Sequence, residues 1–156
     1  MKKIRSLLLA AVAMEMAACA TTNSSDLYDP NAPVVAISIS TFGSVDPSDR
    51  SIALPPGNED LLVALRTALT ADGWTVSTST TATRYLMQLE TKNWTYEQRL
   101  SYINLTVVDE KTANKILTGE RKTYSPNDNP IDLKAVADMV VSSLKKTTSP
   151  AAQSGS

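Results

Sequence analysis

The sequence predicts an α+β fold, a two-layer sandwich in which two helices cover one face of a mostly antiparallel sheet, in the order β-α-β-β-β-β-α. Residues 84–124 alternate apolar and polar side chains in three stretches separated by polar turns, a pattern typical of an antiparallel meander. Residues 59–71 and 130–146 each repeat apolar side chains at helical spacing, which predicts two amphipathic helices.

The opening strand is expected at residues 34–40, because Val35, Ile37 and Ile39 would share one face there. Residues 41–57 hold three prolines and two glycines, so this stretch is expected to be a long loop. A brief strand is expected inside this loop, at Ile52–Leu54.

The first helix is bounded by residues suited to helix ends. Asn58 is a favourable N-cap, and Gly73 suits a left-handed stop, so a helix is expected over residues 59–71. Residues 74–79 are rich in β-forming side chains and are expected to return to extended chain. The apolar stripe of the helix comprises Leu61, Leu62, Leu65, Ala68 and Leu69.

The meander is expected to use residues 84–94, 100–109 and 115–124, with a polar turn at 109–114. Its inward-facing side chains are expected to be Tyr85, Met87, Leu89, Ile103, Leu105 and Val107. The second helix is expected to start at Pro130, because proline is tolerated in a first helical turn, and to end near Lys146. Its apolar face comprises Leu133, Val136, Ala137, Val140 and Leu144.

The N-terminus has the features of a secretory signal peptide. Basic residues at positions 2, 3 and 5 precede an apolar run, which ends in small residues before Cys19. The run is too short to cross a bilayer, which needs about 20 apolar residues. Residues 1–18 are therefore expected to be a lipoprotein signal peptide, with Cys19 as the first residue of the mature chain.

The residues before Cys19 resemble a bacterial lipobox, which implies that this cysteine carries lipid. The chain departs from the pattern at Met16, where leucine is favoured, and at Glu15, which interrupts the apolar run. Cys19 is the single cysteine of the chain, and lipidation would remove a free thiol that has no disulfide partner. Two alternatives stay open: cleavage after Ala20 without a lipid, or an incidental cysteine in an uncleaved segment. In lipoproteins of this kind Asp after the cysteine marks inner-membrane retention, so Ala20 implies the outer membrane.

Removal of residues 1–18 from the 156 of the full chain leaves 138, the length of one domain. Residues 19–33 are polar and are expected to form a flexible tether of about 20 Å. The α+β periplasmic domain is expected over 34–146, followed by a disordered tail at 147–156.

The composition excludes several classes of chemistry. The chain contains no histidine, so catalytic triads that use histidine and zinc sites that use histidine are ruled out. Removing Lys2, Lys3, Arg5 and Glu15 from 15 basic and 16 acidic residues leaves 12 and 15, a net charge of −3. The basic residues are not clustered, so no nucleic-acid partner is expected. No metal, no cofactor and no enzymatic activity are expected.

Parts of the domain resemble the TolB N-terminal-like domain and the curli-secretion lipoprotein, over about residues 34–146. The matching features are the helix Leu61–Leu69 that ends at Gly73, the strand Leu105–Asp109, the turn at Lys111-Thr112 and the strand Ile116–Glu120. The resemblance implies an accessory or assembly role in the cell envelope rather than a reaction. A curli-type pore needs additional membrane-inserting hairpins, for which this chain has no room, so pore formation is not implied.

Two short motifs match known sites by spacing alone. Ser142-x-x-Lys145 and Ser143-x-x-Lys146 match the Ser-x-x-Lys of penicillin-interacting enzymes, without the partner motifs, and chance explains them best. Residues 127–129 offer three oxygen side chains that could hold calcium, but the spacing of an EF-hand is absent and a capping role is favoured.

The aromatic residues Trp94, Tyr96 and Tyr102 surround an expected hairpin loop and are the candidates for partner binding. Aromatic side chains with a polar group are enriched at binding surfaces. The alternative is that they pack over the end of the sheet as a minor core.

These features together predict a non-enzymatic lipoprotein of the outer membrane, whose periplasmic domain binds or assists an envelope protein complex. The alternative is a periplasmic module that binds a lipid or a glycan in a cavity between sheet and helices, lined by Met87 and Leu89. The partner-binding hypothesis predicts a flat or shallow surface, and the ligand-binding hypothesis predicts an apolar pocket.

Overall fold

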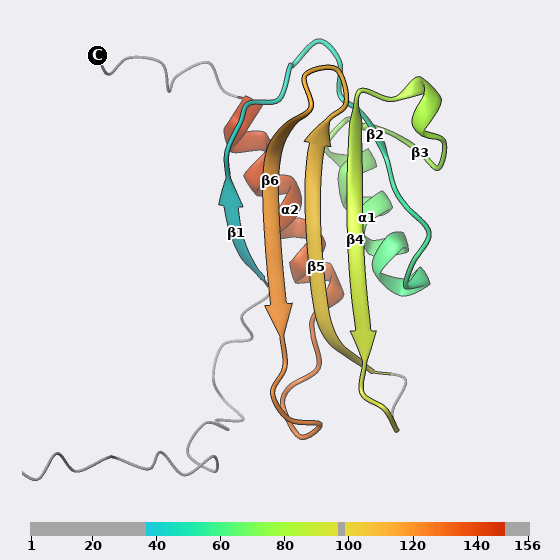
Figure 1. The fold of residues 1–156 in the computed structure, drawn as a ribbon, viewed down its shortest axis with the longest axis vertical. Helices are drawn as coiled ribbons and strands as arrows, with labels where there is room; N and C mark the ends of the chain where they lie inside the picture. The colour runs from blue at the N-terminus through green and yellow to red at the C-terminus, as the bar shows by residue number, and fades with distance from the viewer. Residues whose placement is uncertain (1–36, 97–98, 149–156) are drawn as a thin grey trace, which may run out of the picture.

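The structure, a computed structural model, describes residues 37–96 and 99–148 (Figure 1). The expected signal peptide, Cys19, the tether and residues 149–156 lie outside the described residues. The strands are β1 (Ser38–Thr41), β2 (Ser51–Ala53), β3 (Thr75–Ser77), β4 (Tyr85–Asn93), β5 (Leu100–Asp109) and β6 (Asn114–Lys122). The helices are α1 (Glu59–Ala71) and α2 (Leu133–Thr148), with a short 3-10 turn at Thr80–Ala82.

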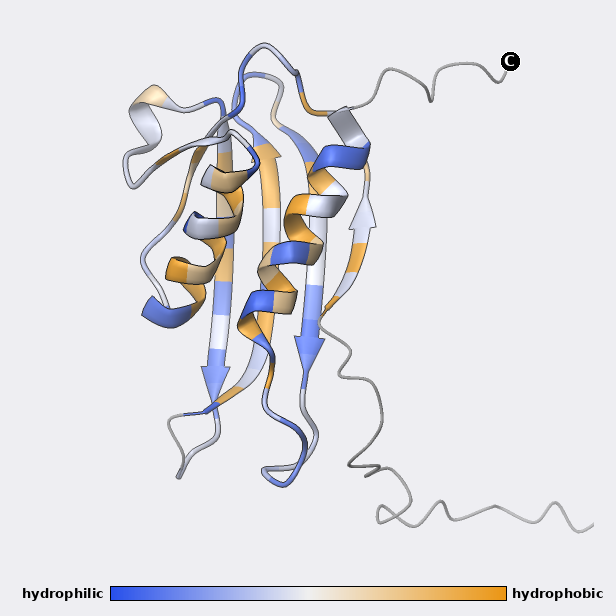
Figure 2. Ribbon diagram, turned by 180° about the vertical axis from the view of Figure 1, so that it is seen from behind, coloured by the Kyte–Doolittle hydropathy of each residue, from blue (hydrophilic) through white to orange (hydrophobic). Residues whose placement is uncertain are grey.

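The predicted fold class is confirmed. Six strands form one sheet in the order β1-β6-β5-β4-β2-β3, in which β1, β6, β5 and β4 pair antiparallel. Both helices lie on the same side of this sheet, behind it in Figure 1 and in front of it in Figure 2. The opposite side, which we call the open face, is covered by neither helix.

The termini of α1 are as predicted. The Asn58 side chain accepts a hydrogen bond from the Leu61 N–H at 3.0 Å, which satisfies one of the free donors of the first turn. At the other end Gly73 adopts φ +84°, and the Trp74 N–H donates to the Leu69 carbonyl at 3.0 Å. A residue with a Cβ is strained in this left-handed conformation, so glycine suits the stop.

The expected start of the second helix at Pro130 is wrong. α2 begins at Leu133, because Asp132 caps it by accepting a hydrogen bond from the Ala135 N–H at 3.0 Å. Its last turn runs through Thr148, so Thr147 and Thr148 are helical rather than part of a tail. The apolar face is as expected, with Val136, Ala137, Val140 and Leu144 buried.

The brief strand expected at residues 52–54 has a larger structural role than its length suggested. β2 lies inside the sheet and pairs parallel with both β3 and β4. The chain therefore runs from β2 through α1 to β3, a parallel pair joined by a helix, and the opening strand β1 lies at the far edge beside β6. Ile52 and Ala53 are both fully buried, and Ile52 belongs to the hydrophobic core.

One hydrophobic core fills the space between the sheet and the helices. The expected inward side chains of β4 and β5 occupy it, and Trp74 packs edge-on against Tyr85 with ring centroids 5.6 Å apart. Leu89 is partly buried against this core. Its fully enclosed members include Ile52, Leu61, Leu65, Leu69, Tyr85, Met87, Ile103, Leu105, Val107, Leu117, Val136, Val140 and Leu144.

The position of β2 predicts a large effect of one substitution. Ile52→Ala is expected to lower the free energy of unfolding by about 2–5 kcal/mol, because it leaves a cavity in a site enclosed by two strands. Urea unfolding measures this. Val63→Ala, at a side chain 54% exposed on α1, is the control and is expected to change stability by about 0.5 kcal/mol or less. Equal effects of the two substitutions would contradict a buried β2.

Candidate functional site

The three candidate aromatic residues lie at one end of the sheet, around the hairpin that joins β4 to β5. Tyr102 lies on the open face in a cross-strand row with Lys92 of β4 and Lys122 of β6. The Lys92 ammonium lies 5.2 Å from the centre of the Tyr102 ring and 3.1 Å from the Glu90 carboxylate. The row therefore carries two lysines around one aromatic ring.

Trp94 and Tyr96 differ in exposure although they are two residues apart. Trp94 is half-buried, and its backbone N–H donates to the Arg99 carbonyl at 3.0 Å, which closes the hairpin. Tyr96 is 98% exposed. The structure thus brings the three predicted residues to one end, with Trp94 partly in the packing and Tyr96 wholly in solvent.

A fourth aromatic residue at this end was missed by the sequence analysis. Tyr124 follows β6, is 80% exposed, and lies under the Lys122 ammonium at 5.4 Å from its ring centre. The loops after β4 and after β6 project from the same end of the molecule in both views (Figures 1 and 2). The Lys122-x-Tyr124 spacing was the available signal, because alternate residues of an extended chain share one side. We call Trp94, Tyr96, Tyr102, Tyr124, Lys92 and Lys122 the aromatic end.

The described chain begins beside the aromatic end. Ser38, the first residue of β1, pairs with Glu120 of β6 in antiparallel register. Ile37 is therefore level with Arg121, next to the lysine of the terminal row. β1 then runs away from this end (Figure 1).

The open face is a shallow polar surface. Its central rows pair Glu90 with Asn104 and Gln88 with Thr106, and the same two β5 residues pair with Glu120 and Thr118 of β6. A shallow hollow of about 390 Å³ lies over β1, β5 and β6. Its lining comprises Ser38, Ser40, Asn104, Thr106, Lys115, Thr118, Gly119 and Glu120. Five of these residues have small side chains that can form hydrogen bonds, and Lys115 and Glu120 contribute one charge of each sign.

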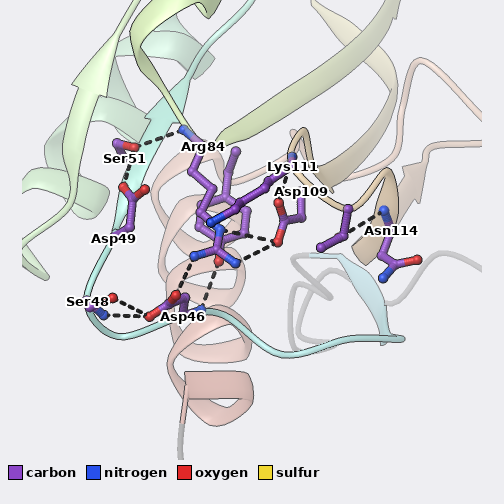
Figure 3. A network of polar contacts seen from close by, with 10 residues as sticks. Asp46, Ser48, Asp49, Ser51, Arg84, Asp109, Lys111 and Asn114 are labelled. Atoms are coloured by element: carbon purple, nitrogen blue, oxygen red, sulfur yellow. Dashed lines mark hydrogen bonds and ion pairs between the residues drawn. The ribbon is translucent and has the colours of Figure 1, made fainter.

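A network of charged side chains occupies the opposite end of the sheet (Figure 3). Arg84, just before β4, forms ion pairs with Asp46 and with Asp109, the latter at 3.1 Å. The Tyr85 hydroxyl accepts a hydrogen bond from the Asp46 backbone N–H at 2.8 Å. The guanidinium therefore joins the loop before β2 to the end of β5.

The network holds both carboxyl groups in the charged form. The pKa of Asp46 is lowered to about 2, first by the hydroxyl and the N–H of Ser48 and then by Arg84. Burial disfavours the charge of Asp109, but hydrogen bonds from Arg84 and from the Lys111 N–H outweigh it, so its pKa is also lowered. The same two carboxylates raise the pKa of Arg84, Asp109 contributing most. Each charged group of this network has a partner of opposite charge, so we assign the network a structural role.

The network also explains why the long loop before β2 is ordered. Within this loop Val45 is buried, its N–H donates to the Thr147 carbonyl at 3.3 Å, and the next residue is Asp46. The Phe42 N–H donates to the Ile116 carbonyl at 2.9 Å. The loop is thereby fastened to both α2 and β6.

The two Ser-x-x-Lys motifs lie in the last turns of α2. There Lys145 forms an ion pair with Asp72. The Lys145 ammonium is 3.6 Å from the Asp72 carboxylate at the end of α1. Lys145 therefore belongs to a surface ion pair between the helices.

The residues considered for calcium form a turn. The Asp128 carboxylate accepts hydrogen bonds from the N–H groups of Tyr124 at 2.7 Å and Ser125 at 2.8 Å. The helix cap that the sequence placed here belongs to Asp132 instead. Within residues 37–96 and 99–148 no three His, Cys, Asp or Glu side chains gather in a way that could hold a metal ion.

The alternative apolar pocket lined by Met87 and Leu89 is filled. Met87 has no exposed surface, and Leu89 packs against the core. Met87 therefore belongs to the core between the sheet and the helices, and Leu89 packs against the same core.

The chain matches no protein-family profile and no curated protein. It is similar to a PDZ domain protein from Parabacteroides distasonis (12% identity, TM-score 0.46), covering 73% of this chain and 36% of that one. It is also similar to PelC from Paraburkholderia phytofirmans, a dodecamer (13% identity, TM-score 0.42), covering 72% and 98%. A minor lipoprotein from Acinetobacter baumannii superposes with a TM-score of 0.32 at 18% identity, covering 63% and 92%. At these values the likenesses assign no function to the chain.

None of the helices in the described residues is both long and apolar enough to span a bilayer.

The charged network predicts a specific acid sensitivity. Because the folded pKa of Asp46 lies near 2 and its usual value near 3.8, its contribution is complete above about pH 4 and is lost as the pH falls through about 2. Asp46→Asn is therefore expected to lower stability at neutral pH and to flatten the rise of stability with pH in this window. Urea unfolding at a series of pH values measures it.

Ser48→Ala is the graded companion, because it removes one of the hydrogen bonds and leaves the Arg84 pair. Ser48→Ala is expected to lower stability at neutral pH and to flatten its pH dependence, but by less than Asp46→Asn does. An Asp46→Asn protein with the parent's pH dependence would refute the role of this carboxylate.

Proposed function

We propose that this chain is a non-enzymatic lipoprotein of the cell envelope, anchored in the outer membrane through a lipid on Cys19. Its folded domain binds a protein complex of the envelope. The observation that carries the proposal is the contrast between the two sides of the sheet. On the helix side Met87 is wholly buried in the core, whereas the open face carries a shallow hollow of about 390 Å³.

The open face suits a protein partner better than a small ligand. Small ligands bind in concave, mostly apolar sites that enclose them. The hollow on this face is shallow, and most of the side chains that line it are polar, with Tyr102 at the border of the face. Non-obligate protein interfaces carry about one hydrogen bond per 100–200 Å², so a surface rich in hydrogen-bonding side chains is compatible with such an interface.

The anchor is supported by the sequence of the N-terminus. A basic start, a short apolar run and a single cysteine after small residues together suit lipid attachment at Cys19. From Cys19 to Ile37 the chain advances 18 residues, which reach at most about 65 Å when extended. The domain is thus confined to the neighbourhood of the bilayer, where an envelope complex would meet it.

Intact-mass measurement tests the anchor. The protein extracted from the membrane fraction is expected to begin at Cys19 and to carry a diacylglyceryl group and an amide-linked acyl chain. Cys19→Ser is expected to abolish both the cleavage and the added mass, because serine has no thiol for the thioether. Thr21→Ser is the control and is expected to retain the lipid. An unmodified chain that begins at Thr21 would show simple secretion and refute the anchor.

Site-specific crosslinking in cells tests the partner surface. A photoreactive amino acid at Gln88 or Glu120 on the open face is expected to give one protein adduct, whereas Met139 on the outer side of α2 gives none. Thr106→Arg, which lies between the two probes, is expected to reduce the adduct by about tenfold, because an unpaired charge would be pressed into the interface. Adducts from Met139 instead, with none from the open face, would contradict the proposal.

A further inference from the structure

We propose that the aromatic end of the domain lies on an anionic phospholipid surface, with Tyr96 and Tyr124 in the headgroup layer. This inference rests on the lipid anchor of the proposed function and concerns the end of the sheet, which adjoins the open face at the row of Lys92, Tyr102 and Lys122. It reassigns Trp94 and Tyr96, which the sequence suggested for a protein partner, to the membrane.

The first support is the exposure of two tyrosines on loop tips. Tyr96 is 98% exposed and Tyr124 is 80% exposed, and they come from two loops that project from the same end. Tyrosine is favoured where one end of a side chain is apolar and the other is wet, as it is at the level of lipid headgroups. Protruding tips of this kind can enter a fluid interface without a shape-matched partner.

The second support is charge. Lys92 and Lys122 flank Tyr102, and the Lys122 ammonium also lies 5.4 Å from the Tyr124 ring. Lysine side chains can keep their ammonium groups among phosphates while their stems cover apolar surface. Glu90 pairs with Lys92, and the acidic residues Glu120 and Asp128 lie on β6 and in the loop after it, so the charge of this end is mixed and Lys122 is the lysine outside the Glu90 pair. Arg99 and Arg121 lie in the adjoining residues of the hairpin and of β6.

The third support is the direction from which the chain arrives. The register of β1 against β6 places Ile37 level with Arg121, so the segment that links the domain to Cys19 joins it at the aromatic end. The described part of α2 ends at the opposite end of the sheet, as Figure 1 shows. Of the two ends, the aromatic end is therefore the one from which the chain leads back toward Cys19.

A matched pair of labels on the full-length, acylated protein tests the proposal. Thr95→Cys places a nitroxide beside Tyr96, and Thr41→Cys places one beside Phe42, an aromatic residue 63% exposed at the other end. Phe42 also lies under a lysine, since the Lys115 ammonium is 5.6 Å from its ring centre. In the acylated chain Cys19 carries the lipid, so the introduced thiol is the one that takes the label.

The labelled proteins are reconstituted into vesicles of phosphatidylcholine with a minority of phosphatidylglycerol, and their collisions with a water-soluble paramagnetic agent are measured. The label at position 95 is expected to be about threefold less accessible than the label at 41, because headgroups cover it. Replacing both Lys92 and Lys122 by Gln, or both Tyr96 and Tyr124 by Ala, is expected to remove this difference. Circular dichroism checks that each variant is folded.

Three results would overturn the inference and are distinguishable from one another. Equal accessibility at 95 and 41 in protein that still sediments with vesicles would refute the contact and leave the anchor intact. Shielding of position 95 in native membranes but not in vesicles would assign the aromatic end to a protein. An unacylated native mass would remove the anchor, and the membrane contact with it.

Discussion

The cross-strand register of β4, β5 and β6 is the constraint on which the rest of the structure depends. Successive side chains of a strand point to opposite faces, so one register decides both surfaces of the sheet. It places Met87, Leu105 and Leu117 under the helices, and it leaves the residues between them on the open face. A shift by one residue would exchange the core for the surface.

The same register determines the chemistry available at the surface. It brings Lys92, Tyr102 and Lys122 into one row at the aromatic end. At the other end it brings Asp109 within reach of Arg84, which then holds Asp46 and the loop before β2. The row at the aromatic end lies on the surface and is available for contact. The charged groups around Arg84 form ion pairs with one another.

Much of the fold could be predicted because its signals are local. The Asn58 cap, the Gly73 stop and the alternation in the meander each depend on residues close together in the chain, and each is present in the structure. The start of the second helix could not be read as well. Pro130 and Asp132 both suit a helix N-terminus. The helix starts after Asp132 because its side chain caps the first turn, and the sequence alone does not show which of the two residues takes this role.

The candidate site was predicted in part for the same reason. Trp94, Tyr96 and Tyr102 surround one hairpin, so their proximity followed from the hairpin itself. Tyr124 joins them from a loop more than twenty residues later, and its proximity depends on where β6 ends relative to β4. The position of β6 relative to β4 depends on two strand pairings, β4 with β5 and β5 with β6.

By itself the sequence determined the α+β class, the apolar faces of both helices and the alternation of the meander. The spacing of apolar residues along each helix or strand indicates which of its faces is buried. Tertiary structure decided that the short strand β2 is enclosed between β3 and β4, that Arg84 joins two distant carboxylates, and that Tyr96 and Tyr124 share one end. These features bring together residues far apart in the chain. Their contacts exist only once the strands have paired, so no local pattern could specify them.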